Sequence, residues 1–186
     1  MRYRFYQLGA NDSVRSRPLD PALTVELWRP SWREVAPSGV TGHAFKVWWL
    51  FHHLRIFANP DYALLLVRHG GRLIHRSGVY PRYFRFPFMA ASDLQIGDTW
   101  TDPEYRRRGL AHVAIYETTR RLAAPGRRFW YLVGEDNPAS IGVIEQAGFQ
   151  CVGDGDRVPR WGIGLLGAYR LSSGPAAAGR SRHSAH

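Results

Sequence analysis

Short runs of hydrophobic and polar residues divide the chain into segments with two different periods. A two-residue period predicts a strand with one buried face, and steps of three and four residues predict a helix. We therefore expect strands at residues 2–8, 63–68, 72–80, 94–101, 128–133 and 161–171, with another beginning at 149–152. We expect helices at residues 22–35, where Pro30 breaks a loose period, and at 43–58, 107–122 and 138–147.

Two of the expected helices show an apolar face. In the helix at 43–58 this face consists of Val47, Leu50, Phe51 and Leu54, and Asn59-Pro60 predicts the end of the helix. In the helix at 107–122 a rougher face consists of Leu110, Val113, Ala114 and Leu122. These faces are the surfaces expected to pack on a sheet.

The helix at 138–147 carries start and stop signals. Asn137 is a favourable N-cap, Pro138 suits the first helical position, and Gly148 favours the C-terminal stop. Earlier in the chain, Gly70-Gly71 predicts a hairpin turn between the strands at 63–68 and 72–80.

The order of the elements indicates an α/β (α+β) fold. Strands alternate with helices in the second half, which predicts layers around a mixed sheet. Residues 11–21 are rich in turn formers, and residues 81–92 form an irregular arm rich in Phe, Arg and Pro. We expect one domain over residues 1–171, followed by a disordered tail over residues 172–186, which are small, polar and contain Pro and Gly.

Length and composition fit one folded domain. The chain has 186 residues, of which 45% are hydrophobic, so it is too apolar for a disordered protein. Cys151 is the only cysteine, which excludes a disulfide framework and a cysteine-built zinc site. A reducing, cytoplasmic setting is the expectation.

No segment of the sequence has the pattern of a secretory signal or a membrane span. Residues 1–8 alternate charged and aromatic side chains and lack a basic head followed by an apolar run. The most apolar stretch, residues 43–57, contains charged residues and histidines and is too short to cross a bilayer. We therefore expect no membrane insertion.

The formal net charge is +10, and nearly all of the positive charge is arginine, because Lys46 is the only lysine. A basic surface attracts polyanions such as nucleic acid, anionic lipid or a phosphate-rich cofactor. Charge alone does not choose among these partners, and a solvated arginine-rich surface that reflects coding bias explains it equally well.

The segment from Thr101 to Ala111 breaks a local rule. Arg106, Arg107 and Arg108 lie at an expected helix N-terminus, which already carries a partial positive charge from its unpaired amides. Small side chains at positions 109 and 111 allow the backbone to approach a ligand closely. A strand, a turn and a helix start together form a phosphate cradle. The alternative is a solvated arginine cluster with a glycine turn.

Other phosphate-binding motifs fail. The pattern G-x-x-x-x-G-K-[ST] does not occur, so the chain has no P-loop. Residues 162–167 match G-x-G-x-x-G, but they lie near the end of the chain, leave no room for a βαβ unit, and lack the downstream acidic residue. We interpret these glycines as part of a final strand or turn.

The segment from Asp93 to Phe149 resembles the core of the GNAT superfamily of acyl-CoA-dependent N-acyltransferases. Arg106, Gly109 and Ala111 match the signature Arg/Gln-x-x-Gly-x-Gly/Ala, and residues 103–105 before it are also typical of the family. Asn137-x-x-Ser140 leads a helix that ends in Gly148-Phe149, which resembles the second family signature. The resemblance covers about a third of the chain.

The resemblance implies a single GNAT-like domain with a mixed, mostly antiparallel sheet flanked by helices and with splayed strands at the acyl-CoA site. It implies acetyl-CoA as the acyl donor and no metal. The pyrophosphate would lie on the amides that follow Arg106, namely those of Arg107, Arg108, Gly109, Leu110 and Ala111. The pantetheine arm would pair with the backbone of Thr99, Trp100 and Thr101. Asn137 would bond near the pantetheine, and Ser140 would lie close to it.

Candidate catalytic groups lie on the strand at 94–101. Asp98 would be a carboxylate among apolar side chains, which is costly, unless a bulge at Gly97 turned it toward the cleft. We hypothesise that Asp98 is a base or a substrate anchor and that Gln95 positions water or the acceptor. The alternative is that Asp98 is a structural partner for an arginine. Ile144 occupies the position at which many family members have a tyrosine that protonates the departing thiolate, so we assign no general acid.

Aromatic and arginine residues outside the signatures suggest the acceptor. Phe45, Trp48, Trp49, Phe51 and the arm from Tyr83 to Met89 offer rings with interleaved arginines, which suit a nucleotide-linked amino sugar and several other amines. The alternative is that these rings belong to the core, and this is the favoured interpretation for Phe51.

Together these observations predict acetyl transfer from acetyl-CoA to the primary amine of a small-molecule acceptor. The first rival is a catalytically weak acyl-CoA-binding sensor. The second is a basic nucleic-acid-binding module, which the lack of a recognisable nucleic-acid motif disfavours. The sequence leaves a homodimer open.

Overall fold

The computed structural model describes residues 2–15, 18–160 and 163–172. Its strands are β1 (Arg2–Leu8), β2 (Leu23–Trp28), β3 (Ala63–His69), β4 (Arg72–Pro81), β5 (Leu94–Thr101), β6 (Phe129–Gly134), β7 (Gln150–Arg160) and β8 (Ile163–Leu171). Its α-helices are α1 (His43–His53), α2 (Leu110–Arg121) and α3 (Pro138–Gln146), and a 3-10 helix covers Pro103–Tyr105. The expected tail lies outside the described residues apart from Ser172.

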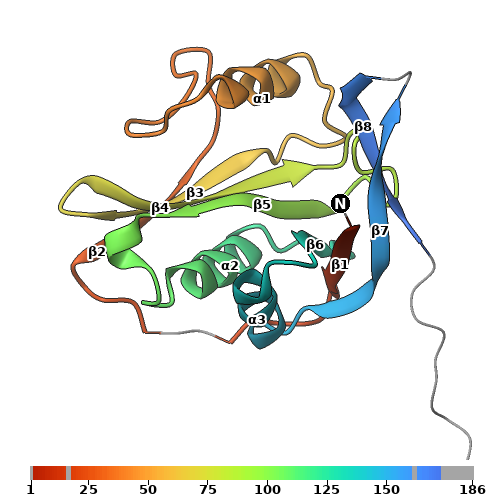
Figure 1. The fold of residues 1–186 in the computed structure, drawn as a ribbon. Coiled ribbons are helices and arrows are strands. Elements are labelled where there is room, and N and C mark those ends of the chain that lie inside the picture. The colour runs from red at the N-terminus through yellow and green to blue at the C-terminus, as the bar shows by residue number, and fades with distance from the viewer. Residues whose placement is uncertain (1, 16–17, 161–162, 173–186) are drawn as a thin grey trace, which may run out of the picture.

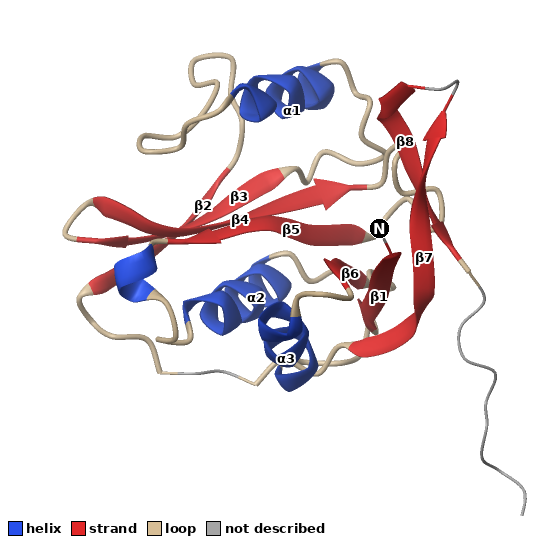
Figure 2. Ribbon diagram, viewed as in Figure 1, coloured by secondary structure: helices blue, strands red, loops and turns tan. Residues whose placement is uncertain are grey.

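The strands form an eight-stranded sheet in the order β2-β3-β4-β5-β6-β1-β7-β8. Neighbouring strands are antiparallel except β5 and β6, which are parallel. Helix α1 covers one face of the sheet, and α2 and α3 cover the other (Figure 1, Figure 2). This architecture confirms the expected α/β (α+β) fold with a mixed, mostly antiparallel sheet.

Residues 23–28 form strand β2, so the helix expected at 22–35 is wrong. Half-buried side chains alternate with exposed ones up to Trp28, which is buried. The strand pairs with β3 from Leu23 opposite His69 to Trp28 opposite Leu64. The neighbouring strand supplies hydrogen-bond partners for the whole segment, and this outweighs a weak helical period.

Helix α1 forms where expected but ends at His53, before the Asn59-Pro60 signal. The backbone of Arg55 has a φ of 55°, in the left-handed region, so the helix does not continue to that signal.

Three of the four residues expected on the core-facing side of α1 do not face the core, and only Phe51 of the four packs against it. Val47, Leu50 and Leu54 are 44%, 45% and 62% exposed, whereas Phe45 is 3% exposed. The helix packs its aromatic side on the sheet, because rings bury more apolar surface than aliphatic side chains do. Phe45 is therefore a core residue and not part of an open acceptor wall.

Helix α2 begins at Leu110, three residues later than expected, so the three arginines lie in the loop before it. Its expected apolar face is confirmed, because Leu110, Val113 and Ala114 are buried, as is Leu122 just beyond the helix. Helix α3 has the expected boundaries within one residue.

The hydrophobic core consists of two main clusters. One cluster includes Ile115 of α2, Ile144 of α3 and Phe149, packed against strands β1, β5 and β6. The other includes Phe45 of α1 and a group of rings from the strands, the segment between α1 and β3, and the arm, namely Trp28, Phe57, Tyr62, Tyr80, Tyr83, Phe86 and Trp130. The second cluster is the aromatic side of the molecule.

A buried carboxylate joins the beginnings of the two parallel strands. Asp93, fully buried just before β5, accepts hydrogen bonds from the backbone N–H of Arg128 at 3.2 Å and from Trp130 Nε1 at 2.8 Å. The Arg128 guanidinium lies 3.1 Å from the same side chain. Because Arg128 and Trp130 lie at the start of β6, Asp93 fixes β5 against β6 at one end.

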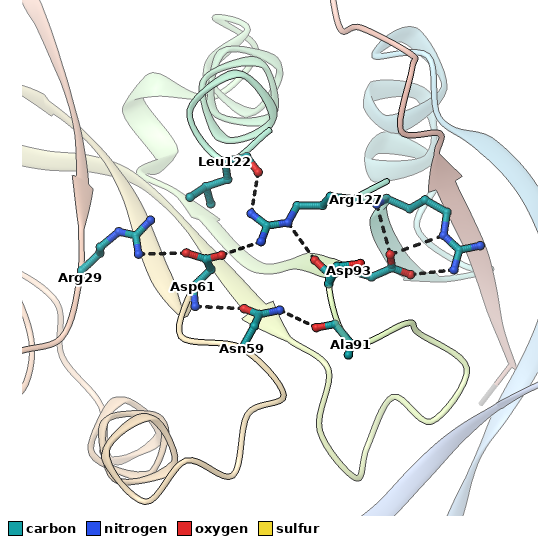
Figure 3. A network of polar contacts seen from close by, with 9 residues as sticks. Arg29, Asn59, Asp61, Ala91, Asp93, Leu122 and Arg127 are labelled. Carbon is teal, nitrogen blue, oxygen red and sulfur yellow. Dashed lines mark hydrogen bonds and ion pairs between the residues drawn. The ribbon is translucent and has the colours of Figure 1, made fainter. Parts of the chain in front are cut away.

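A second polar network surrounds this junction (Figure 3). Arg127 donates to Asp61 Oδ2 at 2.6 Å, to the Leu122 carbonyl at 2.7 Å and to the Ser92 carbonyl at 2.8 Å. Asp61 also accepts a bond from Arg29 at 3.0 Å. Burial alone would raise the pKa of Asp61, but the bonds from Arg127 and Arg29 lower it below its usual value.

None of the helices in the described part of the chain is long and apolar enough to cross a membrane.

We predict that Asp93→Ala lowers the free energy of unfolding by about 3 kcal/mol, because it leaves buried donors without an acceptor. Urea unfolding followed by circular dichroism measures this loss. The control Asp136→Ala removes an exposed carboxylate and should change stability by less than about 0.5 kcal/mol. Equal losses for the two variants would contradict the clamping role of Asp93.

We also predict that Asp61→Asn lowers stability by about 1–2 kcal/mol at pH 7, through the loss of charge-assisted hydrogen bonds. A carboxylate with a depressed pKa stabilises the fold above its unfolded pKa, and this contribution disappears as the pH falls through its folded pKa. The difference from the wild type should be constant from about pH 5 to 8 and shrink below about pH 4. Urea unfolding across this range tests the expectation, and an undiminished difference at about pH 2.5 would contradict it.

Candidate functional site

The parallel strands β5 and β6 separate partway along their length. They pair from Leu94 opposite Phe129 to Ile96 opposite Tyr131, and no pair between them follows within the described residues. Beyond this point β5 continues beside β4, and β6 continues beside β1. The strand edges facing each other across the gap therefore have backbone groups without a partner in the opposite strand, which is the splay that the family resemblance implied.

A bulge interrupts β5 where the splay begins. Gly97 pairs with Gly78, and Trp100 pairs with Arg76, so Asp98 and Thr99 together oppose one residue of β4. Asp98 has a φ of 46°, which a residue with a side chain rarely adopts. The irregularity expected at Gly97 therefore lies one residue further on, and it turns Asp98 out of the apolar alternation.

Asp98 has an arginine partner and also faces a cavity. Its carboxylate lies 2.8 Å from the Arg76 guanidinium, which in turn lies over the Phe45 ring at 4.7 Å. The Asp98 side chain remains 44% exposed. Asp98 therefore both pairs with an arginine and faces the cavity, so the two alternatives considered for this residue occur together.

The cavity beside Asp98 has a volume of about 340 Å³ and opens on the α1 face of the splay. Strands β5 and β6 contribute Gln95, Gly97, Asp98 and Leu132. Helix α1, strand β4, the arm and the two ends of the described chain contribute the other walls, which are Tyr3, Ala44, Trp48, Tyr80, Tyr83, Arg85, Phe86 and Tyr169. We name this space the aromatic cavity.

Three phenols of the aromatic cavity, those of Tyr80, Tyr83 and Tyr169, are protonated at neutral pH. Burial raises the pKa of Tyr80 well above its usual value, and the charge of Asp98 raises it further. Burial also raises the pKa of Tyr83 and of Tyr169. The described walls therefore combine neutral rings with the charges of Asp98 and Arg85, and Arg85 lies over the rings of Trp48 and Tyr83.

The expected aromatic acceptor residues divide between cavity and core. Trp48, Tyr83 and Phe86 line the aromatic cavity, whereas Phe51 packs against the aromatic cluster, as its helical position suggested. Trp49 lies elsewhere, with its Nε1 bonded to the Ser31 carbonyl at 2.8 Å. Sequence reasoning missed Tyr3 and Tyr169, because only the tertiary structure brings the first and last strands to this site.

Gln95, the other proposed catalytic residue, is buried at the base of the aromatic cavity. Its Nε2 donates to the Ile96 carbonyl at 2.6 Å. The structure therefore brings Gln95 and Asp98 to the same cavity, with the side-chain amide of Gln95 already engaged by the backbone.

On the other side of β5, the arginine loop is held by contacts at its start. Asp102 accepts a bond from Arg72 Nη2 at 2.6 Å, and the Tyr105 hydroxyl bonds to His69 Nδ1 at 2.8 Å. Beyond these anchors Arg107 and Gly109 have φ values of 61° and 78°. Two left-handed residues in three reverse the chain direction directly before α2.

The start of α2 offers free backbone donors. Gly109 occupies the N-cap position, no described side chain caps the helix, and its first turn contains no acidic residue. Arg106, Arg107 and Arg108 are exposed. An uncapped helix start surrounded by guanidinium groups favours an anion.

A cavity of about 140 Å³ lies at this helix start. Its walls come from β5, the loop, α2 and α3, and they are Thr101, Tyr105, Arg106, Arg107, Gly109, Leu110, Ala111, His112, Val143 and Gln146. The expected cradle residues therefore lie together, except Arg108, which lies over the Tyr105 ring at 4.9 Å. Amides, guanidinium groups and a small opening fit a diphosphate.

Asn137 and Ser140 lie at the start of α3. The Asn137 side-chain oxygen accepts a hydrogen bond from the Ser140 N–H at 3.1 Å, so Asn137 acts as the N-cap. Ile144, on the same helix, is 1% exposed and packs in the core cluster under α2 and α3. An isoleucine side chain has no proton to donate.

A family model described as Acetyltransferase (GNAT) family matches residues 23–149, which is more than half of the chain. No curated protein sequence matches the chain at a significant level.

The solved structures similar to the chain include the three described next. A GNAT-family acetyltransferase from Novosphingobium aromaticivorans has 22% identity and a TM-score of 0.50, over 83% of this chain and 62% of that one. A GCN5-related N-acetyltransferase from Sphaerobacter thermophilus has 15% identity and a TM-score of 0.52, over 81% and 48% of the two chains. A functionally unknown conserved protein from Staphylococcus epidermidis has 12% identity and a TM-score of 0.51, over 82% and 58%. At these identities the likeness concerns the fold, and the chain spans about half to three fifths of each structure's length.

Proposed function

Because the chain belongs to the GNAT family of acetyltransferases, we propose that it transfers an acetyl group from acetyl-CoA to a primary amine of a small-molecule acceptor. The observation that carries this proposal is the position of the splay. The gap between β5 and β6 lies between an uncapped, arginine-rich helix start and a cavity that holds a carboxylate.

The donor would be held mainly by backbone. The amides from Arg107 to Ala111 receive the diphosphate of acetyl-CoA, and guanidinium groups of the loop offset its charge. The edge of β5 from Thr99 to Thr101 has no partner on the β6 side among the residues that the structure describes, so it can pair with the amide groups of the pantetheine arm. Asn137 and Ser140 would flank that arm from the start of α3.

The acceptor would enter the aromatic cavity with its amine toward Asp98. A half-exposed carboxylate attracts an ammonium group and can accept its proton, and the amine must be neutral before it attacks a thioester. Gln95 would position the acceptor or a water molecule at the base of the cavity. A nucleotide-linked amino sugar suits the rings and Arg85, but a cavity of about 340 Å³ favours a compact amine body.

One observation favours a second candidate function. Ile144, at the position of the family's proton-donating tyrosine, is buried and apolar, which suits a catalytically weak acyl-CoA-binding sensor. A screen of thiol release from acetyl-CoA separates the two functions, with amino sugars, nucleotide-linked amino sugars, polyamines, amino acids and arylalkylamines as acceptors. Release with one class supports the transferase, whereas tight acetyl-CoA binding without release across the panel supports the sensor.

We predict that Gly109→Val lowers the affinity for coenzyme A at least tenfold. A β-branched residue resists the left-handed backbone at this position and would move the amides that hold the diphosphate. Isothermal titration calorimetry with coenzyme A measures the loss. Gly126→Val is a matched control, because Gly126 has a φ of 72° and open space around it. It should lose similar stability and keep its affinity, and equal affinity losses would contradict the cradle.

We predict that Asp98→Asn lowers kcat/KM for the best acceptor about tenfold or more, since a charge-assisted hydrogen bond contributes about 1.5–3 kcal/mol. The affinity for acetyl-CoA should be retained. Steady-state kinetics with varied acceptor test this, with Asp156→Asn on β7 as a control for the loss of an exposed charge. Unchanged turnover and acceptor affinity in Asp98→Asn would eliminate the role of Asp98.

A further inference from the structure

Five polar side chains form a continuous hydrogen-bonded row across β4, β5 and β6. The Tyr131 hydroxyl lies 2.8 Å from Thr99 Oγ1, which lies 3.2 Å from Ser77 Oγ. Ser77 Oγ lies 3.1 Å from His75 Nε2, and His75 Nδ1 lies 2.8 Å from Thr101 Oγ1. We name these five residues the hydroxyl row.

The two ends of the hydroxyl row lie at the two parts of the proposed donor site. Thr101 lines the small cavity at the start of α2. Tyr131 is the last β6 residue that pairs with β5, so its side chain reaches Thr99 where the strands begin to separate. Between them, Ser77 and His75 are buried. The row thus connects the diphosphate end of the site, through the buried His75 and Ser77, to Thr99, which is exposed at the splay.

The face of the sheet on which Tyr131 lies is that of Ile144. Both residues belong to the core cluster under α2 and α3, and the Tyr131 ring contacts the ring of Phe149 at the end of α3. Ile144 has no proton to give, whereas the phenol of Tyr131 has one. Burial raises the pKa of Tyr131, so the phenol is protonated at neutral pH.

The side chains of the hydroxyl row carry one more mobile proton than the number of hydrogen bonds that join them. Thr101, His75, Ser77, Thr99 and Tyr131 carry one mobile proton each while the imidazole is neutral, and four hydrogen bonds join them. When every bond is directed toward Tyr131, His75 donates from Nε2 and accepts at Nδ1. The phenolic proton is then the one not used within the row.

The imidazole of His75 is suited to pass a proton without becoming charged. Burial lowers its pKa to about 4, with a further contribution from the charge of Arg76, so it is neutral at pH 7. Accepting a proton at Nδ1 while donating one from Nε2 exchanges one neutral tautomer for the other. No buried imidazolium forms, which avoids the cost of burying an unpaired charge.

We propose that Tyr131 is the proton donor to the sulfur of coenzyme A as the thioester breaks, and that the rest of the hydroxyl row returns a proton to it. This inference rests on the proposed function. The amine nitrogen forms a bond to the acyl carbon, the carbon–sulfur bond breaks, and the sulfur takes the phenolic proton. Thr99, Ser77, His75 and Thr101 each pass one proton toward Tyr131. Solvent at Thr101 supplies the last proton, and the proton that Asp98 takes from the amine and releases to solvent balances it.

The transfer of protons along the hydroxyl row explains why Tyr131 needs the other four side chains. A thiol has a lower pKa than a phenol, so a lone tyrosine would protonate a thiolate unfavourably. When Thr99 delivers a proton to the phenolate as it forms, the charge does not stay on the buried ring. The proton that the amine gives up leaves on the opposite face of the sheet, toward Asp98, so the overall reaction conserves protons.

The first test is Tyr131→Phe, measured with acetyl-CoA and the best acceptor of the amine screen. We expect kcat to fall about 100-fold, as for the loss of a general acid, with less than a threefold change in KM for acetyl-CoA. The affinity for coenzyme A by calorimetry should stay within threefold. A wild-type kcat with unchanged affinity would overturn the proposal. An absence of turnover in the wild-type protein would instead count against the proposed function itself.

The second test interrupts the row and leaves the phenol in place. Thr99→Val removes the hydroxyl next to Tyr131 and should lower kcat about tenfold, and Thr99→Ser should recover most of the loss because it retains the hydroxyl. Thr118→Val is the matched control, because its buried hydroxyl has no hydrogen-bond partner among the described residues. Equal kcat for Thr99→Val and Thr118→Val would overturn the relay.

A third measurement does not depend on turnover. In ¹⁵N-labelled protein at pH 7, His75 should be neutral with its proton on Nε2, and its resonance is identified by its absence in His75→Gln. Ser77→Ala should change the Nε2 chemical shift, and saturating acetyl-CoA should change it in the wild type but not in Thr99→Val. A charged His75, or shifts that are indifferent to Ser77 and to acetyl-CoA, would overturn the proposal.

Discussion

Asp93 lies fully buried between the beginnings of β5 and β6 and accepts bonds from the backbone and side chains of the second strand. These bonds fix one end of the parallel pair, while the pair itself lasts only to Ile96 and Tyr131. Beyond this point, within the described part of the chain, each strand pairs only with its antiparallel neighbour, β5 with β4 and β6 with β1. A strand pair that is clamped at one end and separated at the other produces a wedge, and every part of the candidate site lies along it.

The wedge separates two chemically different surfaces. On the helix side, the start of α2 has no capping side chain among the described residues and no acidic residue in its first turn. It follows three exposed arginines, so the arrangement carries positive charge. On the α1 side, neutral rings enclose Asp98, whose bulged backbone removes it from the apolar alternation of β5. An anionic donor and a cationic acceptor are thus drawn to opposite faces, so they meet at the gap in the sheet rather than compete for one pocket.

The interior beneath the wedge is polar where a simple core would be apolar. His75 and Ser77 are buried on β4, yet their side chains bond to one another and to hydroxyls of β5. Buried polar groups persist in folded proteins when they are paired in this way. The bulge at Asp98 and Thr99 brings a further hydroxyl to the row, so the same irregularity that exposes the carboxylate to one cavity completes the polar contacts on the other face.

The sequence by itself determined the strand and helix order after residue 63, the hairpin at Gly70-Gly71, the N-cap at Asn137 and the arginine loop before α2. Each depends on neighbouring residues, through period, capping or turn conformation, and such signals are local. Only the tertiary structure decided that residues 23–28 form a strand, that α1 buries Phe45 rather than Val47, and that Tyr3 and Tyr169 meet at one cavity. It also decided that Tyr131 faces Thr99 across the splay. These outcomes depend on which surfaces the rest of the chain supplies, because a strand edge, an aromatic cluster or a hydroxyl partner distant in sequence leaves no mark on the local pattern.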